Sequence, residues 1–405
     1  MVHQQKEAAP LAALRVLDLA DEKACFCSKL LADMGAEVIK VERPGGDAAR
    51  WVGPFWGNIP HSEKSLSFWY NNTSKLGVTL NLESNKGQNI FLRLASQADV
   101  VVETFPPGYL KRIGLSYEVL TEKNPRLILA SVTGFGQTGP YRQYKSCDIV
   151  ASALGGQMYV CGNHDTPPLQ PYGQQSYYAA SLFAAIGILI ALQERNRSGR
   201  GQHLDISLQE ALAATLEHVI VRYFYEKVVA ARQGNLHWTN SACLLPCKEG
   251  YMLITFSREW ETLVELLDSE GMAADLKEER WRKESYRRQH VEHIIEVLES
   301  WTRTHTTDEL YELGQLMRFP WAPVSSPQEV FNSPQLRARD FFVSVEHPEA
   351  STSFIYPGAP GKFSGSSWNI WRRAPLIGEH NAQVYHEELG LSLKELARLS
   401  AINVI

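Results

Sequence analysis

Three basic residues stand close to segments that read as strands of a parallel sheet. Arg43 follows the alternating segment 37–42, Lys75 precedes the apolar run VTLNL, and Arg112 comes shortly after the apolar segment 99–103. Ligands of open parallel sheets bind at the carboxyl ends of the strands, and cations placed there suit a multiply charged phosphate. Ion pairing on the protein surface explains the same residues, so the pattern alone leaves both interpretations open.

A glycine-rich loop follows the predicted strand 126–132. Gly134, Gly136 and Gly139 fit the spacing of a dinucleotide-binding loop. Pro140 comes directly afterwards, no suitable amphipathic helix begins there, and no acidic residue ends a second strand at the required place. These features favour a turn in which glycine permits close backbone approach over an NAD site. Walker A, GxSxG and HExxH motifs are absent, so kinases, esterases and metalloproteases gain no support.

Composition narrows the class of protein further. The chain has 405 residues and a formal net charge of -5, which argues against a nucleic-acid partner. Six cysteines and twelve histidines lack the paired spacing of a metal site, so no metal is expected. No leader and no apolar run of about 18 residues is evident, and we expect a cytoplasmic protein without a membrane partner. The segment 166–193 contains no Asp or Glu.

Strand-like and helix-like patterns alternate along the first half of the chain. Strands are predicted at 14–19, 37–42, 99–103, 126–132 and 203–207. Helices are predicted at 27–34, 84–98, 177–195 and 208–230, with Ser84 as an N-cap and Gly35 and Gly199 as stops. This alternation predicts an α/β fold with a parallel sheet. The charged, helical segment 275–310 indicates a smaller inserted domain, and the tail from 341 is rich in turns before a helix at 392–400.

Four blocks in a fixed order resemble the CaiB/BaiF family, also called the class III or formyl-CoA transferase-like CoA-transferases. They cover 14–50, 98–141, 184–211 and 375–392, and include LRVLDL, ETFPPGYLKRIG, GILIALQERNRSGRGQ and PLIGEHN. The resemblance implies a Rossmann-like large domain built from both chain ends, a small inserted domain, and an interlocked, ring-like dimer. We therefore assign 1–225 and 331–405 to the large domain, and 226–330 to the small one.

The resemblance also implies a reaction. In this family an active-site aspartate attacks an acyl-CoA, and an aspartyl-CoA thioester delivers CoA to an acceptor carboxylate, which is covalent catalysis. Coenzyme A and acyl-CoA are then substrates, and no tightly bound cofactor is expected. The resemblance places CoA contacts at Arg43, Lys75, Phe105 and Arg112, and at Thr104, which stands where the family often has asparagine.

The nucleophile of the family is missing. Its aspartate precedes the helix glycine, here Gly187, by ten residues, and that position is Tyr177. A shift of one residue gives Ser176, and no acid lies between Asp165 and Glu194. A tyrosine, with an ordinary pKa near 10, cannot form the acyl anhydride. The resemblance therefore predicts no catalytic residue in this chain.

The prediction from these departures is a non-catalytic subunit of a heteromeric CoA-transferase. Its partner is a homologous chain that keeps the aspartate, in an interlocked heterodimer or heterotetramer. Two alternatives stay open: a homomeric acyl-CoA isomerase, lyase or direct-attack transferase in which Tyr177 or Tyr178 donates a proton, and a CoA-binding regulatory module without turnover. Aromatic residues between 51 and 70 fit a pocket for a bulky aromatic acceptor and an apolar core equally well.

Overall fold

The structure is a computed structural model that describes residues 9–405, and it divides into two compact units. Unit 1 comprises the chain up to Gln157 together with Gln170–Glu226 and Arg337–Ile405. Unit 2 comprises Met158–Leu169 and Lys227–Leu336. The predicted ranges 1–225, 226–330 and 331–405 and the interlocked dimer stay predictions.

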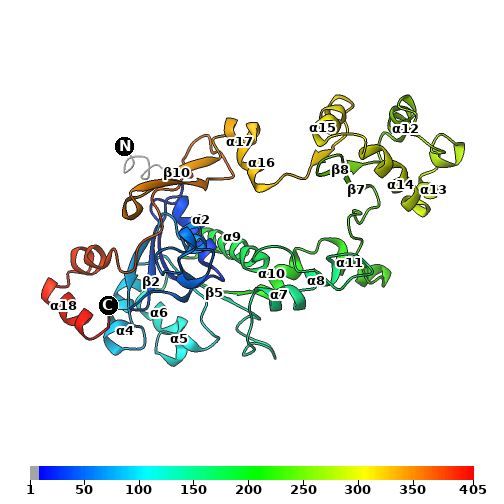
Figure 1. The fold of residues 1–405 in the computed structure, drawn as a ribbon. Helices are drawn as coiled ribbons and strands as arrows, with labels where there is room; N and C mark the ends of the chain where they lie inside the picture. The colour runs from blue at the N-terminus through cyan, green and yellow to red at the C-terminus, as the bar shows by residue number, and fades with distance from the viewer. Residues whose placement is uncertain (1–8) are drawn as a thin grey trace. The chain divides into compact units, whose positions relative to one another are not determined.

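Unit 1 is built on a sheet of six parallel strands, which confirms the α/β class (Figure 1). The strands are β1 (Arg15–Leu19), β2 (Glu37–Glu42), β3 (Leu76–Thr79), β4 (Val100–Glu103), β5 (Ile128–Thr133) and β6 (His203–Ser207). Their order is β3-β2-β1-β4-β5-β6. The chain moves outward from β1 to β3 and then returns to place β4 beside β1, so the direction of winding reverses between these two strands. Ligands of doubly wound sheets bind at such a switch point.

Alternating strand residues face two helical layers. Leu17 on β1 packs in the same core cluster as Leu94 on α4 (Asn85–Ala95) and Leu120 on α6 (Tyr117–Lys123). Its neighbour Val16 packs in the opposite cluster with Leu31 on α2 (Cys25–Asp33). The C-terminal helix α18 (Leu393–Ala401) joins the first layer, and α9 (Gln175–Ser198) and α10 (Leu208–Ala214) join the second. Both faces of the sheet are thus covered, as a parallel sheet requires.

Several predicted helix boundaries are confirmed. The Ser84 side chain accepts a hydrogen bond from the backbone N–H of Gly87 at the start of α4. Gly35 follows α2 with φ of 102°, and Gly199 ends α9 with φ of 75°, a conformation that favours glycine. The predicted single helix at 208–230 is wrong, because α10 ends before Thr215 and a separate helix α11 (His218–Glu226) follows.

Unit 1 contains further α-helices and one β-hairpin. They are α3 (Leu66–Asn71), α5 (Tyr109–Arg112), α7 (Asp148–Leu154), and the antiparallel hairpin of β10 (Phe342–His347) and β11 (Thr352–Pro357). The helix α8 (Gln157–Val160) and the helix α17 (Pro334–Ala338) cross the boundary between the units. The hairpin lies in the tail that the sequence predicted only as turn-rich.

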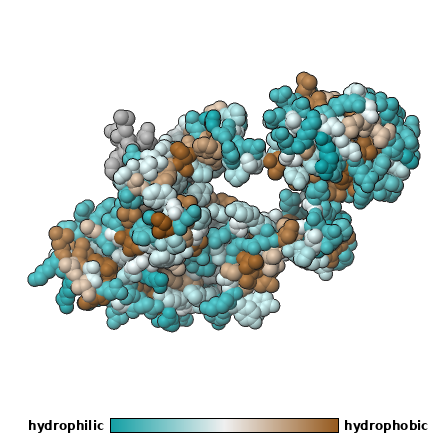
Figure 2. Space-filling view, viewed as in Figure 1, coloured by the Kyte–Doolittle hydropathy of each residue, from teal (hydrophilic) through white to brown (hydrophobic). Residues whose placement is uncertain are grey.

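The helix α9 has the length and the apolar composition of a membrane-crossing helix, although its apolar run alone looked too short in the sequence. In this unit it packs Ala180, Ala184 and Ile188 into the core beneath the sheet, as the core helix of a folded domain does. Its other face leaves five large apolar side chains exposed: Leu182, Phe183, Ile186, Leu189 and Ile190. In the chain by itself α9 is therefore buried on one face and exposed on the other. Figure 2 shows that exposed apolar residues gather in several surface patches between hydrophilic ones.

Unit 2 has its own small sheet and core. Its antiparallel strands are β7 (Ala242–Pro246), β8 (Tyr251–Thr255) and β9 (Ala322–Pro323). Its other helices are α12 (Trp260–Ser269), α13 (Glu284–Gln289), α14 (Val291–Thr302), α15 (Thr307–Leu316) and α16 (Pro327–Asn332). Trp281, Trp301 and Trp321 are among the largest fully buried side chains of this core. The charged segment 275–310 is helical over much of its length, as its period predicted.

Candidate functional site

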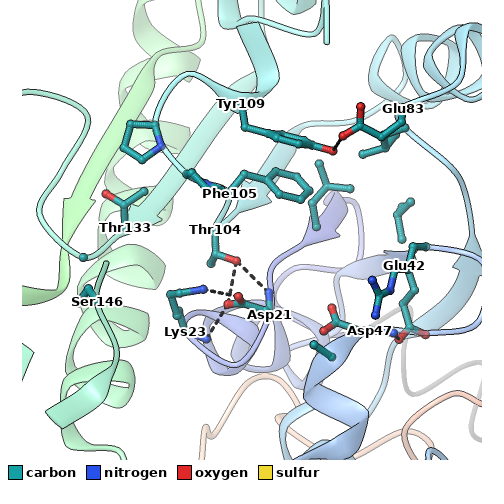
Figure 3. Close-up of a pocket in the computed structure, with 18 of the residues that line it drawn as sticks. Asp21, Lys23, Glu42, Asp47, Glu83, Thr104, Phe105, Tyr109, Thr133 and Ser146 are labelled. Carbon is teal, nitrogen blue, oxygen red and sulfur yellow. Dashed lines mark hydrogen bonds and ion pairs between the residues drawn. The ribbon is translucent and has the colours of Figure 1, made fainter. Parts of the chain in front are cut away.

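A cavity of about 820 Å³ lies at the carboxyl ends of the parallel strands (Figure 3). Its walls come from the last residues of β1, β2 and β5 and from the segments that follow β3 and β4. Its lining includes Leu19, Glu42, Leu80, Thr104, Phe105, Tyr109, Thr133 and the loop from Arg142 to Ser146. The fold therefore places the cavity at the edge where parallel sheets bind ligands.

The two sides of the switch point are tied together by Asp21, which follows β1, and Thr104, which follows β4. The Thr104 hydroxyl donates to Asp21 Oδ1 at 2.9 Å and accepts from the Asp21 backbone N–H at 3.0 Å. Lys23 contacts the same carboxylate, as Figure 3 shows. This small network fixes the floor of the cavity with groups that satisfy one another.

The charges that line the cavity are unequally engaged. Each acidic residue of the lining has a cationic partner within unit 1, in the pairs Asp21–Lys23, Glu42–Arg50, Asp47–Lys40 and Glu83–Arg112. Three cations of the lining, Arg43, Arg142 and Lys145, form no ion pair with any of residues 9–405. The charge left available to a ligand is therefore positive, which suits a phosphate-bearing molecule.

Three of the five predicted CoA contacts line this cavity. Arg43 donates from Nε to the Gly46 carbonyl at 3.1 Å, which leaves its terminal N–H groups available. Thr104 and Phe105 line the wall, and the Phe105 ring stacks on Tyr109 with centroids 4.4 Å apart. Arg112 lies outside the lining, where its guanidinium is 3.5 Å from Glu83 and lies over the Tyr109 ring. It supports the wall from behind.

Lys75 is placed differently from the other predicted contacts. Its ammonium is fully buried and donates to Asp18 Oδ2, the Cys25 carbonyl and Asn72 Oδ1 at 2.8 to 2.9 Å. All three donors of the ammonium are used inside the protein. In this structure Lys75 is thus the internal counter-ion of the fully buried Asp18, and it does not line the cavity.

Sequence reasoning missed two of the free cations, Arg142 and Lys145. They lie in the loop that follows β5 and the glycine turn. Gly136 and Gly139 each have φ of 84°, which confirms the turn interpretation of this motif. Both oxygens of the Asp205 carboxylate accept from the Gln137 backbone N–H, at 3.0 and 2.9 Å, and hold the turn against β6. Both cations follow a predicted strand in the sequence, and this position could have identified them as candidate ligand contacts.

Tyr177, at the position predicted for the nucleophile, lies in the first turn of α9 and is only 5% exposed. Its hydroxyl accepts a hydrogen bond from the Asp148 backbone N–H at 3.1 Å, at the start of α7. Burial raises the pKa of the phenol, and the negative charge of Glu22 adds to this effect. The neighbouring Ser176 donates its hydroxyl to Asp148 Oδ1 at 2.7 Å. The position is therefore occupied by a neutral side chain that joins α7 to α9.

Within residues 9–405 no cluster of three or more His, Cys, Asp or Glu residues could hold a metal ion. The six cysteines are free thiols, and burial raises the pKa of both Cys25 and Cys27. The chemistry that the described residues offer is binding of an anion at the strand ends.

Residues 11–381 match the family described as CoA-transferase family III. The subunit BbsE of succinyl-CoA:(R)-benzylsuccinate CoA-transferase from Thauera aromatica is 36% identical over 92% of this chain and 93% of that protein. The succinyl-CoA:mesaconate CoA-transferase of Haloarcula hispanica is 34% identical over 92% and 95%. The beta subunit of succinyl-CoA–L-malate CoA-transferase from Chloroflexus aurantiacus is 31% identical over 98% of each chain.

Solved structures agree with these sequence matches. A CaiB/BaiF family protein from Brucella suis superposes with a TM-score of 0.84 at 30% identity, over 94% of this chain and 99% of that one. A protein from Mycobacterium tuberculosis gives a TM-score of 0.79 at 26% identity, over 93% and 99%. The likeness therefore extends over both units of the chain.

Proposed function

Because this chain belongs to CoA-transferase family III, the CaiB/BaiF family, we propose that it is the nucleophile-lacking subunit of a heteromeric CoA-transferase. In this proposal the complex moves CoA from an acyl-CoA such as succinyl-CoA to a carboxylic acid, and the partner chain provides the aspartate. The similarity to BbsE suggests (R)-benzylsuccinate, and thus anaerobic toluene degradation, as the setting. The chain by itself is then inactive, and it acts in the cytoplasm.

Tyr177 is the observation on which the proposal depends. The covalent mechanism needs an ionised carboxylate that can hold an acyl group and release it to CoA. A buried phenol with a raised pKa stays protonated at neutral pH, and this one is already hydrogen-bonded to the Asp148 N–H. The first turn of α9 therefore holds a structural side chain at the position where the mechanism needs a nucleophile.

The cavity supports retention of CoA recognition. Coenzyme A carries a diphosphate and a further phosphate, and the cavity is lined by three cations without an ion pair among residues 9–405: Arg43, Arg142 and Lys145. Binding CoA without the nucleophile gives the chain a role in holding or shaping a site whose reacting groups come from the partner.

The exposed apolar face of α9 supports the proposal that this chain binds a partner chain. The five apolar residues from Leu182 to Ile190 recur at helical spacing and are each 38 to 64% exposed. Contiguous apolar surfaces of this kind mark protein interfaces. Two of the relatives, from Thauera aromatica and Chloroflexus aurantiacus, are themselves named as subunits.

The test is reconstitution. The chain is purified alone and together with an aspartate-bearing homologue encoded beside it, and transfer of CoA from succinyl-CoA to a panel of acids, (R)-benzylsuccinate included, is measured by chromatography. We expect no transfer by the chain alone and transfer by the complex. A Tyr177→Phe complex should stay fully active. Turnover by the chain alone would overturn the proposal.

A further inference from the structure

A second cavity, of about 390 Å³, is lined by the same turn that forms a wall of the first. The turn comprises residues 104–109, and Pro106, Pro107 and Tyr109 line both cavities. The second cavity also contains Glu103, Ser131 and His203, three groups that the proposed function does not use. The two cavities therefore share one wall.

The parallel register brings the three groups together. Glu103 at the end of β4 pairs with Ser131 on β5, and both are almost fully buried. Ser131 Oγ lies 2.9 Å from Nε2 of His203, at the start of β6, and it also hydrogen-bonds Glu103. At the other end, Glu103 Oε2 accepts from the Phe105 backbone N–H at 2.6 Å. A continuous path thus runs from an exposed imidazole to a backbone amide of the turn.

We propose that Glu103, Ser131 and His203 form a proton-linked relay that positions the turn 104–109 and thereby makes the affinity of the neighbouring cavity for CoA depend on pH. The relay itself rests only on the geometry of these residues, whereas its effect on CoA rests on the proposed function. Glu103 is a positioning residue, since it acts on the cavity through Phe105.

The path has two balanced states. With Glu103 ionised, Ser131 donates to the carboxylate and His203 Nε2–H donates to Ser131. When one proton is taken up from water at Nδ1 of His203, Nε2 passes a proton to Ser131 and Ser131 passes one to Glu103. The neutral acid keeps a weaker hydrogen bond to the Phe105 N–H, because a charged acceptor binds an N–H more strongly than a neutral one.

Glu103 is expected to ionise close to neutral pH. Burial raises the pKa of Glu103 to about 7, while the hydrogen bonds from Ser131 and the Phe105 N–H and the charge of Lys23 oppose the rise and Asp21 adds to it. Burial lowers the pKa of His203, against the charges of Asp205 and Glu118, so the imidazole is neutral there. These charged groups face the relay from the loop after β1, from β6 and from α6, and Lys111 of α5 and Arg142 of the loop after β5 also line the second cavity.

The first experiment follows the turn without any ligand. The full chain is labelled with ¹⁵N-phenylalanine, and the Phe105 amide resonance is followed from pH 5.5 to 8.5. We expect an inflection close to pH 7 that is absent in Glu103→Gln and displaced upward in Ser131→Ala. The control is Glu122→Gln, which removes an exposed carboxylate of the same helix α6 that does not line the second cavity and should leave the inflection unchanged. A wild-type titration without inflection, or one that survives in Glu103→Gln, would overturn the relay.

The second experiment measures CoA affinity by calorimetry at pH 6 and pH 8. We expect the wild-type protein to bind CoA about fivefold more tightly at pH 8 than at pH 6, after correction for the change in affinity measured with Glu103→Gln. Because the variant has no carboxyl group at position 103, its change in affinity reports the titration of CoA itself. Equal changes in the two proteins would overturn the link to CoA. Absence of CoA binding at both pH values would overturn that link and the proposed nucleotide cavity together, while the Phe105 titration would still decide the relay.

Discussion

At the start of α9 a buried phenol fills the position predicted for the family's nucleophile, whereas at the strand ends three cations line a cavity. Both regions belong to unit 1, yet one holds a neutral, buried phenol and the other holds cations that suit a phosphate-bearing ligand. The two regions differ because covalent catalysis and phosphate binding depend on different numbers of residues. Covalent catalysis depends on one carboxylate, while phosphate binding depends on several cations and on the edge of a sheet that the fold maintains anyway.

The largest effect is expected from Lys75, the buried cation that pairs with Asp18 and does not line the cavity. Replacement of Lys75 by Met leaves the buried Asp18 carboxylate without its ammonium partner, and we expect a loss of about 3–5 kcal/mol in the free energy of unfolding. Urea unfolding followed by circular dichroism measures this loss. CoA affinity of the fraction that remains folded should be unchanged, and a weakened affinity would place Lys75 among the ligand contacts after all.

The next effect concerns the wall of the cavity. The pKa of Glu103 is raised in the folded chain, so between its ordinary value of 4.5 and about 7 the native state binds more protons than the unfolded state. Stability is therefore expected to fall as the pH rises through this window, by about 3 kcal/mol in total. Unfolding curves at pH 5 and pH 8 measure the fall. Glu103→Gln should flatten it, and an equal fall in that variant would contradict this assignment.

A comparable effect is expected from the cavity itself. The double variant Arg142→Gln, Lys145→Gln removes two of the three unpaired cations, and we expect CoA affinity to drop about a hundredfold, with a weaker dependence on salt. Calorimetry at two salt concentrations is the measurement. Lys394→Gln on α18, an exposed lysine away from the cavity, is the matched control. Unchanged affinity in the double variant would mean that CoA binds elsewhere.

The smallest effect is expected at the nucleophile position. Tyr177→Phe keeps the ring in the core but leaves the Asp148 N–H without its acceptor, at a cost of about 1 kcal/mol of stability. Thermal unfolding measures this cost, and the rate of CoA transfer by the complex should not change. A fall in rate larger than the loss of folded protein would give the phenol a chemical role and break the contrast between the two regions.

The sequence predicted those parts of the fold that depend on local pattern. The N-cap at Ser84, the stop at Gly199 and five of the six parallel strands follow from residue type and period alone. The hairpin of β10 and β11 was missed because its pairing joins short segments whose period is masked by turn residues. The break between α10 and α11 was missed because neither glycine nor proline marks it.

The candidate site was predicted only in part for a similar reason. Arg43 and Lys75 looked alike as cations beside strands, but Arg43 follows β2 whereas Lys75 precedes β3 and its backbone lies at the amino end of the strand. Whether a cation is free or paired depends on acids brought near by the fold, such as Asp18, which is 57 residues away in sequence. Spacing cannot supply that information.

The apolar face of α9 has a consequence for how the protein must be made. In the proposed heteromer the partner covers this face, and a chain synthesised without that partner would keep Leu182, Phe183, Ile186, Leu189 and Ile190 in water. The free copies would then stick to one another or be taken up by chaperones and proteases, so unequal expression of two genes would be corrected by loss of the surplus chain. For the proposed heteromer, production of both subunits from one transcript would avoid this loss.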